Sequence, residues 1–154
     1  KPRIPWKLPE PTGIQRDGAE IMAIPAERMQ LVFFAELKHA GLQNQYAEID
    51  LSSDKFIDEV APARTFVFYE DIEKLRAGGL IRGGSLECAI VIRDGEPVQT
   101  VYRLDNELAT HKLLDFIGDL AILGRPVNAI ISARGSGHAL NFEFVDILRR
   151  KLKE

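Results

Sequence analysis

The sequence has a single cysteine among its 154 residues, and it has no apolar run that approaches the 18 or more residues of a membrane-spanning helix. Cys88 alone can form neither an internal disulfide nor a cysteine-rich metal site, and we expect it in a buried strand. A chain without disulfides is typical of a reducing compartment, so a cytoplasmic location is expected. The first residues do not resemble a signal peptide, and no transmembrane segment is predicted.

An excess of charge of one sign is also missing. Twenty Lys and Arg residues against 23 Asp and Glu residues give a net charge of -3, which lacks the basic footprint of a nucleic-acid-binding domain. With 45% hydrophobic and 28% charged residues, the chain has the composition of a globular domain that can bury a core. Its length corresponds to one domain, and no nucleic-acid partner is expected.

The order of predicted elements indicates an α+β fold, a two-layer sandwich in which helices cover one face of a β-sheet. Proline-rich residues 1–17 predict an extended lead-in or interdomain linker, followed by one domain over residues 18–154. Ser52 or Ser53 is the predicted N-cap of a short helix that ends near Val60. Strands are predicted over residues 20–24, 28–35, 44–49 and 127–133, and long helices over residues 105–123, with Asp105 as N-cap, and 139–152.

A compact unit interrupts this order. A helix is predicted over residues 69–77, glycine-rich turns follow at residues 78–79 and 83–84, and residues 88–92 form an apolar strand. We interpret this unit as a βαβ insert at about residues 67–91.

A histidine and a carboxylate lie four positions apart in one predicted helix, at His111 and Asp115. Residues i and i+4 of an α-helix lie one above the other, so both side chains point the same way. Leu113, Phe116 and Leu120 mark roughly the opposite face as the buried one. Imidazole and carboxylate are both zinc ligands, so the spacing predicts half of a zinc site. A solvated His/Asp pair is the alternative.

Two further residues on the same stripe favour a buried site or an interface. Gly118 costs about 1 kcal/mol relative to alanine inside a helix. Ile122 gains nothing from facing water. Both are explained if something packs closely on this stripe.

Four motifs occur in order at residues 61–66 (APARTF), 83–86 (GGSL), 111–120 (HKLLDFIGDL) and 136–141 (SGHALN). Together they resemble the C-terminal half of the UDP-3-O-acyl-N-acetylglucosamine deacetylases, zinc amidohydrolases of lipid A biosynthesis. The resemblance covers about residues 18–150. It implies a layer of helices on a sheet, a Zn²⁺ cofactor, and hydrolysis of the N-acetyl amide of UDP-3-O-acyl-N-acetylglucosamine.

The resemblance matches His111 and Asp115 to two of the family's three zinc ligands. The third ligand, a histidine preceded by the glutamate that acts as general base, belongs to the family's N-terminal half. The one histidine outside the four motifs, His39, has no glutamate before it and is not expected to bind metal. Catalytic zinc sites normally use three protein ligands plus water. The implied partner is therefore the N-terminal half, on the same or a separate polypeptide, and this chain alone should be inactive.

Other matched residues have definable roles in amide hydrolysis. The resemblance makes His138 the cationic histidine that stabilises the oxyanion and can protonate the leaving amine. It makes Asp119 the carboxylate that raises the pKa of that histidine, and Thr65 a hydroxyl donor to the oxyanion.

Substrate-binding residues are implied in the same way. Lys112 matches a substrate-binding lysine, and Phe66 matches an aromatic residue beside the sugar. The turn at residues 135–137 can hold a diphosphate oxygen at a helix start. The insert matches a hydrophobic passage for the acyl chain, for which the candidate lining residues are Leu75, Leu80, Ile81, Leu86 and Ile90.

Two departures from the family pattern concern nucleotide recognition. Thr110 stands where the family usually has arginine, and Gly135 stands where it has a basic residue, with Arg134 one place early. Two alternatives therefore stay open. One is a non-catalytic module that binds an acyl chain or a nucleotide sugar, and the other is a related zinc amidohydrolase with a different substrate.

Overall fold

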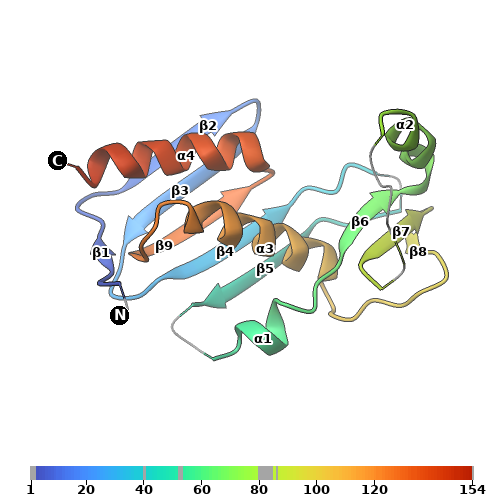
Figure 1. Cartoon of the computed structure of the whole chain (residues 1–154), viewed down its shortest axis with the longest axis horizontal. Helices are drawn as coiled ribbons and strands as arrows, with labels where there is room; N and C mark the ends of the chain where they lie inside the picture. Colours follow the sequence, from blue (N-terminus) through green and yellow to red (C-terminus); the bar gives the residue numbers. More distant parts are fainter. Residues whose placement is uncertain (1–2, 40, 52–53, 80–84, 86, 154) are drawn as a thin grey trace.

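A computed structural model describes residues 3–39, 41–51, 54–79, 85 and 87–153 of the chain. Its larger part is a mixed sheet with the strand order β2-β3-β9-β4-β5, and β1 pairs with the beginning of β9 (Figure 1). Strand β9 runs parallel to β1 and β4 and antiparallel to β3. The strands are β1 (Trp6–Lys7), β2 (Thr12–Arg16), β3 (Ala19–Pro25), β4 (Gln30–Ala35), β5 (Gln45–Asp50) and β9 (Val127–Arg134).

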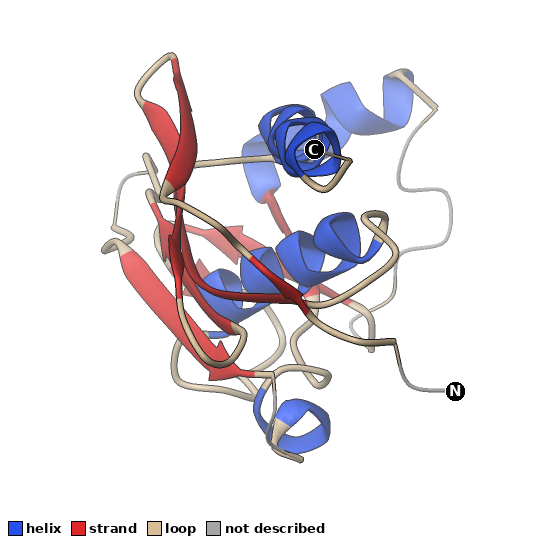
Figure 2. Cartoon of the chain, turned by 90° about the vertical axis from the view of Figure 1, so that its left-hand side faces the viewer, coloured by secondary structure: helices blue, strands red, loops and turns tan. Residues whose placement is uncertain are grey.

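Helices α3 (Glu107–Ala121) and α4 (His138–Lys151) cover one face of this sheet, as Figure 2 shows from the end of the molecule. Alternate residues of β9 face the helices, so that Val127, Ala129, Ile131 and Ala133 are buried. In the core between the helices and the sheet, Phe116 of α3 packs edge to face against Phe33 of β4, with ring centroids 6.0 Å apart. The other core side chains on the helices include Leu113, Leu120, Leu140, Phe144 and Leu148.

The α+β sandwich is confirmed, and three local predictions need correction. Residues 1–17 are not merely a lead-in, because β1 and β2 both pair within the sheet. The N-cap of α3 is Asn106 rather than Asp105, and the helix begins at Glu107, whose carboxylate accepts the backbone N–H of Arg103. Helix α1 (Phe56–Glu59) has Lys55 at its N-cap, and Ser52 and Ser53 lie outside the described residues.

The predicted βαβ insert is present at one end of the molecule (Figure 1). Strands β6 (Thr65–Phe68) and β7 (Ala89–Arg93) pair in parallel, and β8 (Glu96–Pro97) adds an antiparallel third strand. A 3-10 turn, η1 (Tyr69–Asp71), and helix α2 (Ile72–Ala77) follow β6. Cys88 is exposed just before β7, so its expected place in a buried strand is wrong. Ile90 and Ile92 fill the buried positions of β7 instead.

The turn between β7 and β8 lies against the loop that follows β4. Gly41 and Gly95 both have a φ of +84°. A Cβ built on Gly95 would lie 2.5 Å from the carbonyl oxygen of Gly41, and one built on Gly41 would lie 2.7 Å from the carbonyl oxygen of Asp94. The two backbones therefore meet at a point where neither can carry a side chain, and this contact joins the insert to the main sheet.

We expect Gly95→Ala to lower the free energy of unfolding by about 2–3 kcal/mol, since the left-handed backbone costs roughly 1–2 kcal/mol for alanine and the clash with Gly41 adds to it. Urea denaturation followed by circular dichroism measures this. Gly18→Ala is the matched control, because Gly18 also has a positive φ of +82° but, beyond its two chain neighbours, none of the residues in the described ranges lies within 4 Å of its added Cβ. Equal losses in the two variants would contradict a close contact at Gly95.

Candidate active site

The predicted metal pair lies on the middle turns of α3. His111 Nε2 and Asp115 Oδ1 are 3.6 Å apart, and their side chains are 16% and 25% exposed. Both atoms therefore face the same partly accessible position on the surface of α3, whereas the opposite side of the helix packs against the sheet. Lys112 Nζ lies 3.8 Å from the other carboxylate oxygen of Asp115. The described residues contain no group of three or more His, Cys, Asp or Glu side chains that could hold a metal ion.

The ring of Phe66 meets His111 edge to face, with centroids 6.3 Å apart. Phe66 belongs to β6, so this contact places the start of the insert beside the metal pair. His111 Nδ1 is buried and has no hydrogen-bond partner among the described residues. Thr65, the neighbour of Phe66, is exposed, and its hydroxyl makes no hydrogen bond within the part of the chain that the structure covers.

A second group of polar residues joins the later part of α3 to the start of α4. His138 Nδ1 lies 2.8 Å from Asp119 Oδ2. The same oxygen accepts a 2.8 Å hydrogen bond from Asn141 Nδ2. Asp119 and Asn141 are buried, whereas the His138 side chain is 60% exposed. The buried pair thus holds one edge of an imidazole whose other edge faces solvent.

A cavity of about 390 Å³ separates the insert from the end of β9. Phe66, Lys112 and Ser136 contribute to its walls. Ser136 Oγ is buried and without a hydrogen-bond partner in the described residues, so a donor and acceptor is available there. The cavity is bordered by Lys38 and His39 as well, and His39 stacks on Phe68 and pairs with Glu70 at 3.1 Å.

The structure therefore brings most of the predicted residues into two groups, one around His111 and one around His138. Within the described residues, no hydrogen bond, ion pair or ring contact links the two groups. For the acyl passage, Leu80, Ile81 and Leu86 lie outside the described residues. Ile90 is fully buried in the core of the insert, so it does not line an open passage in this chain.

Comparison with known proteins places these groups in context. The family model for UDP-3-O-acyl N-acetylglycosamine deacetylase, LpxC, matches residues 1–150. The chain belongs to the LpxC family. It is similar to the UDP-3-O-acyl-N-acetylglucosamine deacetylase of Oleidesulfovibrio alaskensis, with 37% identity over 146 residues that make up 94% of this chain and 48% of the relative.

Two further LpxC relatives carry the same name. The enzyme of Anaeromyxobacter sp. (strain Fw109-5) is 45% identical over 128 residues, which are 82% of this chain and 42% of that protein. The enzyme of Leptospira biflexa is 34% identical over 137 residues, which are 89% of this chain and 45% of that protein. The chain thus spans about half the length of the curated relatives it matches.

Within this LpxC-family chain, the sequence analysis missed the most extensive polar contact near the site. Arg64 and Glu107 form a buried ion pair, with side chains 4% and 0% exposed. Desolvation alone would raise the pKa of Glu107, but the hydrogen bonds from Arg64 and Arg103 outweigh it and the pKa is lowered. The Glu107 hydrogen bonds raise the pKa of Arg64. The residue motif at 61–66 contained Arg64, but nothing in it indicated the partner 43 positions away.

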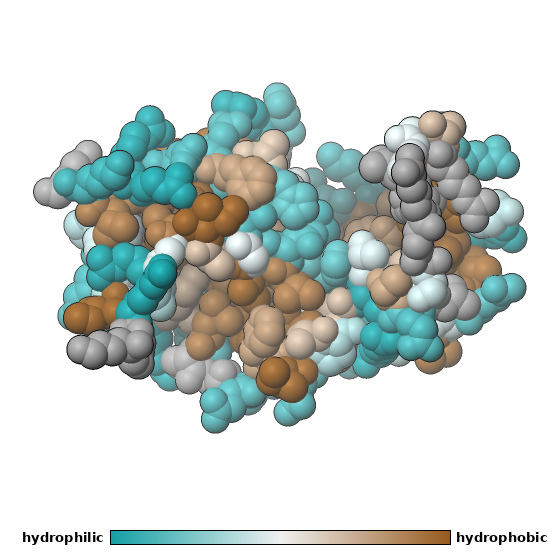
Figure 3. Space-filling model, in the orientation of Figure 1, coloured by the Kyte–Doolittle hydropathy of each residue, from teal (hydrophilic) through white to brown (hydrophobic). Residues whose placement is uncertain are grey.

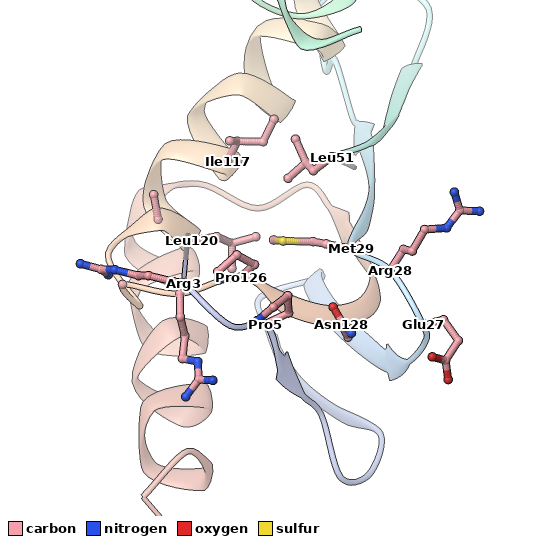
Figure 4. A pocket seen from close by; sticks show the side chains of 13 residues that line it. Arg3, Pro5, Glu27, Arg28, Met29, Leu51, Ile117, Leu120, Pro126 and Asn128 are labelled. Atoms are coloured by element: carbon pink, nitrogen blue, oxygen red, sulfur yellow. The ribbon is translucent and has the colours of Figure 1, made fainter. Parts of the chain in front are cut away.

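A second cavity, of about 700 Å³, lies beside the C-terminal half of α3. Ile117 and Leu120 of α3 point into it, opposite Leu51 and Met29, while Arg28 points away (Figure 4). Apolar side chains gather on this side of the helical face, between α3 and α1 (Figure 3). The cavity contains none of the predicted catalytic or metal-binding residues, so it is separate from the candidate active site.

Proposed function

We propose that this chain is the C-terminal half of a zinc-dependent deacetylase that hydrolyses the N-acetyl amide of UDP-3-O-acyl-N-acetylglucosamine in the cytoplasm, in lipid A biosynthesis. One observation carries the proposal. In a chain that belongs to the LpxC family, His111 Nε2 and Asp115 Oδ1 lie 3.6 Å apart on the accessible flank of α3. One imidazole nitrogen and one carboxylate oxygen that face the same spot suit two positions of a tetrahedral zinc site.

The third ligand and the general base come from the missing half in this proposal. Two features of α3 support a partner on this flank. Gly118 is exposed, and apart from its chain neighbours and the backbone of its own helix no described residue lies within 4 Å of a Cβ added there. Ile122 is 54% exposed. The described residues of this chain do not provide the close packing that the sequence predicts on this stripe, so a second polypeptide surface can provide it. The apolar cavity beside the C-terminal half of α3 adjoins this stripe and enlarges the exposed apolar surface.

The chain's own residues divide the remaining chemistry between them. Bound zinc supplies a water of lowered pKa and polarises the acetamide carbonyl. His138, held at 2.8 Å by Asp119, presents its free edge to solvent, where as imidazolium it can donate a hydrogen bond to the developing oxyanion and give a proton to the leaving amine. Thr65 has an uncommitted hydroxyl, which suits a second donor to the same oxyanion.

The cavity between the insert and the end of β9 suits the nucleotide-sugar end of the substrate. Lys112 supplies a positive charge at its wall, and the buried Ser136 hydroxyl lies just before the N-terminus of α4. A cation, an unpaired hydroxyl and a helix N-terminus all favour an anionic group such as a diphosphate. Phe66 offers an apolar surface to the sugar, and we assign the acyl chain to the insert.

One observation favours a second candidate, a zinc amidohydrolase whose acylated amino-sugar substrate lacks the nucleotide. Arg134, the basic residue one place before Gly135, is paired with Glu20 at 3.0 Å and with Glu36 at 3.1 Å. Two carboxylates therefore occupy the guanidinium, which is a poor arrangement for binding a diphosphate. Comparison of turnover on nucleotide-bearing and nucleotide-free amides separates the two candidates.

The proposal is tested by the affinity of the metal site. We expect this chain alone to bind Zn²⁺ weakly, in the micromolar range or above, because catalytic sites rely on three protein ligands. Addition of the N-terminal half should raise the affinity strongly and produce acetate release from UDP-3-O-acyl-N-acetylglucosamine. Competition with a chromophoric chelator measures the affinity with and without that half.

His111→Ala should abolish the gain in affinity, whereas His39→Ala, which removes a histidine paired with Glu70 instead, should leave it unchanged. Nanomolar binding by the chain alone that is lost in His111→Ala would mean that these residues hold a complete site. That result would contradict the half-site proposal.

A further inference from the structure

The buried pair of Arg64 and Glu107 connects the two ends of the insert to the helix that carries the metal ligands. Glu107 Oε1 accepts the Arg64 backbone N–H at 3.0 Å and Nε–H at 2.8 Å, and Oε2 accepts Nη2–H at 3.0 Å. This is a two-pronged contact between a planar guanidinium and a carboxylate, which fixes orientation as well as distance. We call Arg64 and Glu107 the clamp.

The clamp also holds the segment that leaves the insert. Arg64 Nη1 donates to Thr100 Oγ1 at 2.9 Å, and Nη2 donates to the carbonyl of Val101 at 2.7 Å. Glu107 Oε2 accepts the backbone N–H of Arg103 at 2.6 Å. Arg64 directly precedes β6, the first strand of the insert, and residues 100–103 follow β8, its last strand. Both connections of the insert are therefore tied to one carboxylate at the start of α3.

The position of the clamp in the chain links it to the proposed active site. Glu107 lies one helical turn before His111, so the two residues share a side of α3. Arg64 directly precedes Thr65, and Phe66 makes the edge-to-face contact with His111. A buried ion pair is weak evidence for a stabilising purpose, because the cost of removing two charges from water can exceed their attraction. What this geometry does provide is a fixed position of Arg64, and of the strand that follows it, relative to Glu107 on α3.

We propose that Arg64 and Glu107 are positioning residues, which hold Thr65 and the acyl-binding insert at a fixed place relative to His111 and Asp115. The proposal rests on the proposed deacetylase function. Its physical basis is that reacting groups displaced by about 1 Å can lose on the order of 10²-fold in rate. Loosening the clamp lets β6 move as a unit, and both the oxyanion donor and the acyl passage move with it.

The first test is turnover of the completed enzyme with Glu107→Gln, which keeps the shape of the side chain and removes its charge. We expect kcat to fall on the order of 10–100-fold. KM for a substrate with a long 3-O-acyl chain should rise more than KM for one with a short chain, since the insert is assigned to that chain. Ile21→Ala is the matched control, because Ile21 is fully buried in β3, a strand with no proposed site residue. We expect this variant to destabilise the fold and to leave the contacts of the clamp in place.

The second test measures the position of the insert without turnover. Cys88 is the only cysteine and lies exposed in the insert, where hydrogen bonds from Ser85 lower its pKa and favour labelling. Arg150→Cys supplies a second label on the exposed side of α4. Pulsed electron paramagnetic resonance between two nitroxides then gives the distance distribution in this chain. We expect one narrow distribution with the intact clamp and in Ile21→Ala, and a broad one in Glu107→Gln.

Each combination of results decides the proposal. A kcat loss well beyond that of Ile21→Ala together with a broadened distribution supports it. It is overturned if Glu107→Gln loses no more turnover than Ile21→Ala, or if the distribution stays narrow. If the completed enzyme releases no acetate at all, the deacetylase proposal fails, and the distance distribution alone then decides whether the clamp fixes the insert. If Glu107→Gln does not fold, Arg64→Lys, which keeps the charge without the planar fork, is judged by the same readouts.

Discussion

Replacement of His138 by alanine in the completed deacetylase should lower kcat by about 10²–10⁴-fold, because one general acid or oxyanion donor typically supplies that much. The imidazole is 60% exposed, so its removal should leave the fold nearly intact. The loss should therefore appear in kcat while zinc affinity and thermal stability stay close to those of the unsubstituted enzyme. Steady-state kinetics with acetate detection measures the effect.

Asp119→Asn is the companion to this change. It keeps the size of the side chain that His138 Nδ1 and Asn141 Nδ2 contact, but it removes the negative charge that stabilises an imidazolium. We expect a large loss of kcat in Asp119→Asn and no further loss when it is combined with His138→Ala, since residues that act as a unit are not additive. Unchanged turnover in either single variant would contradict the assigned roles. Ile21→Ala, at a buried position of β3 with no assigned role in the site, is the control for destabilisation.

The layered fold could be predicted because the apolar periodicity of its central elements is strong. The long helix α3 begins and ends within about two residues of its prediction, and β9 extends one residue past its own. The edge strand β2 was missed, since Gly13 and the nearby prolines are typical of a linker. A signal was nevertheless present in Asp17-Gly18, both with positive φ, which is a favoured hairpin turn between β2 and β3.

In the candidate site too, local sequence spacing predicts some of the residues, and long-range contacts determine the others. The pair of His111 and Asp115 follows from helical spacing alone, and the contact of His138 with Asp119 bridges 19 residues across one turn and one strand. Glu107 falls in the first turn of the predicted helix, where an acidic side chain ordinarily faces solvent and complements the dipole. Its burial depends on Arg64, which lies on another element, and a contact of that range leaves no local pattern.

Removal of one partner of the Arg64–Glu107 pair should cause a large loss of stability. We expect Glu107→Ala to lower the free energy of unfolding by about 3–5 kcal/mol at neutral pH, because it leaves a buried guanidinium without its counter-charge. The double variant Arg64→Met/Glu107→Leu should recover much of this loss, since apolar side chains of similar volume carry no desolvation cost. Urea denaturation of the three proteins measures both changes.

The pH dependence of this loss has a definite sign. The pKa of Glu107 is lowered in the folded chain relative to its ordinary value of 4.5. The unfolded chain therefore takes up the proton first as the pH falls, and the stabilisation by the charged pair is complete above pH 4.5 and disappears as the pH falls through the folded pKa. The difference in unfolding free energy between the unsubstituted chain and Glu107→Ala should consequently shrink in acid. A difference that stays constant from neutral pH into the acid range would show that the Glu107 charge contributes nothing and that the loss is one of packing.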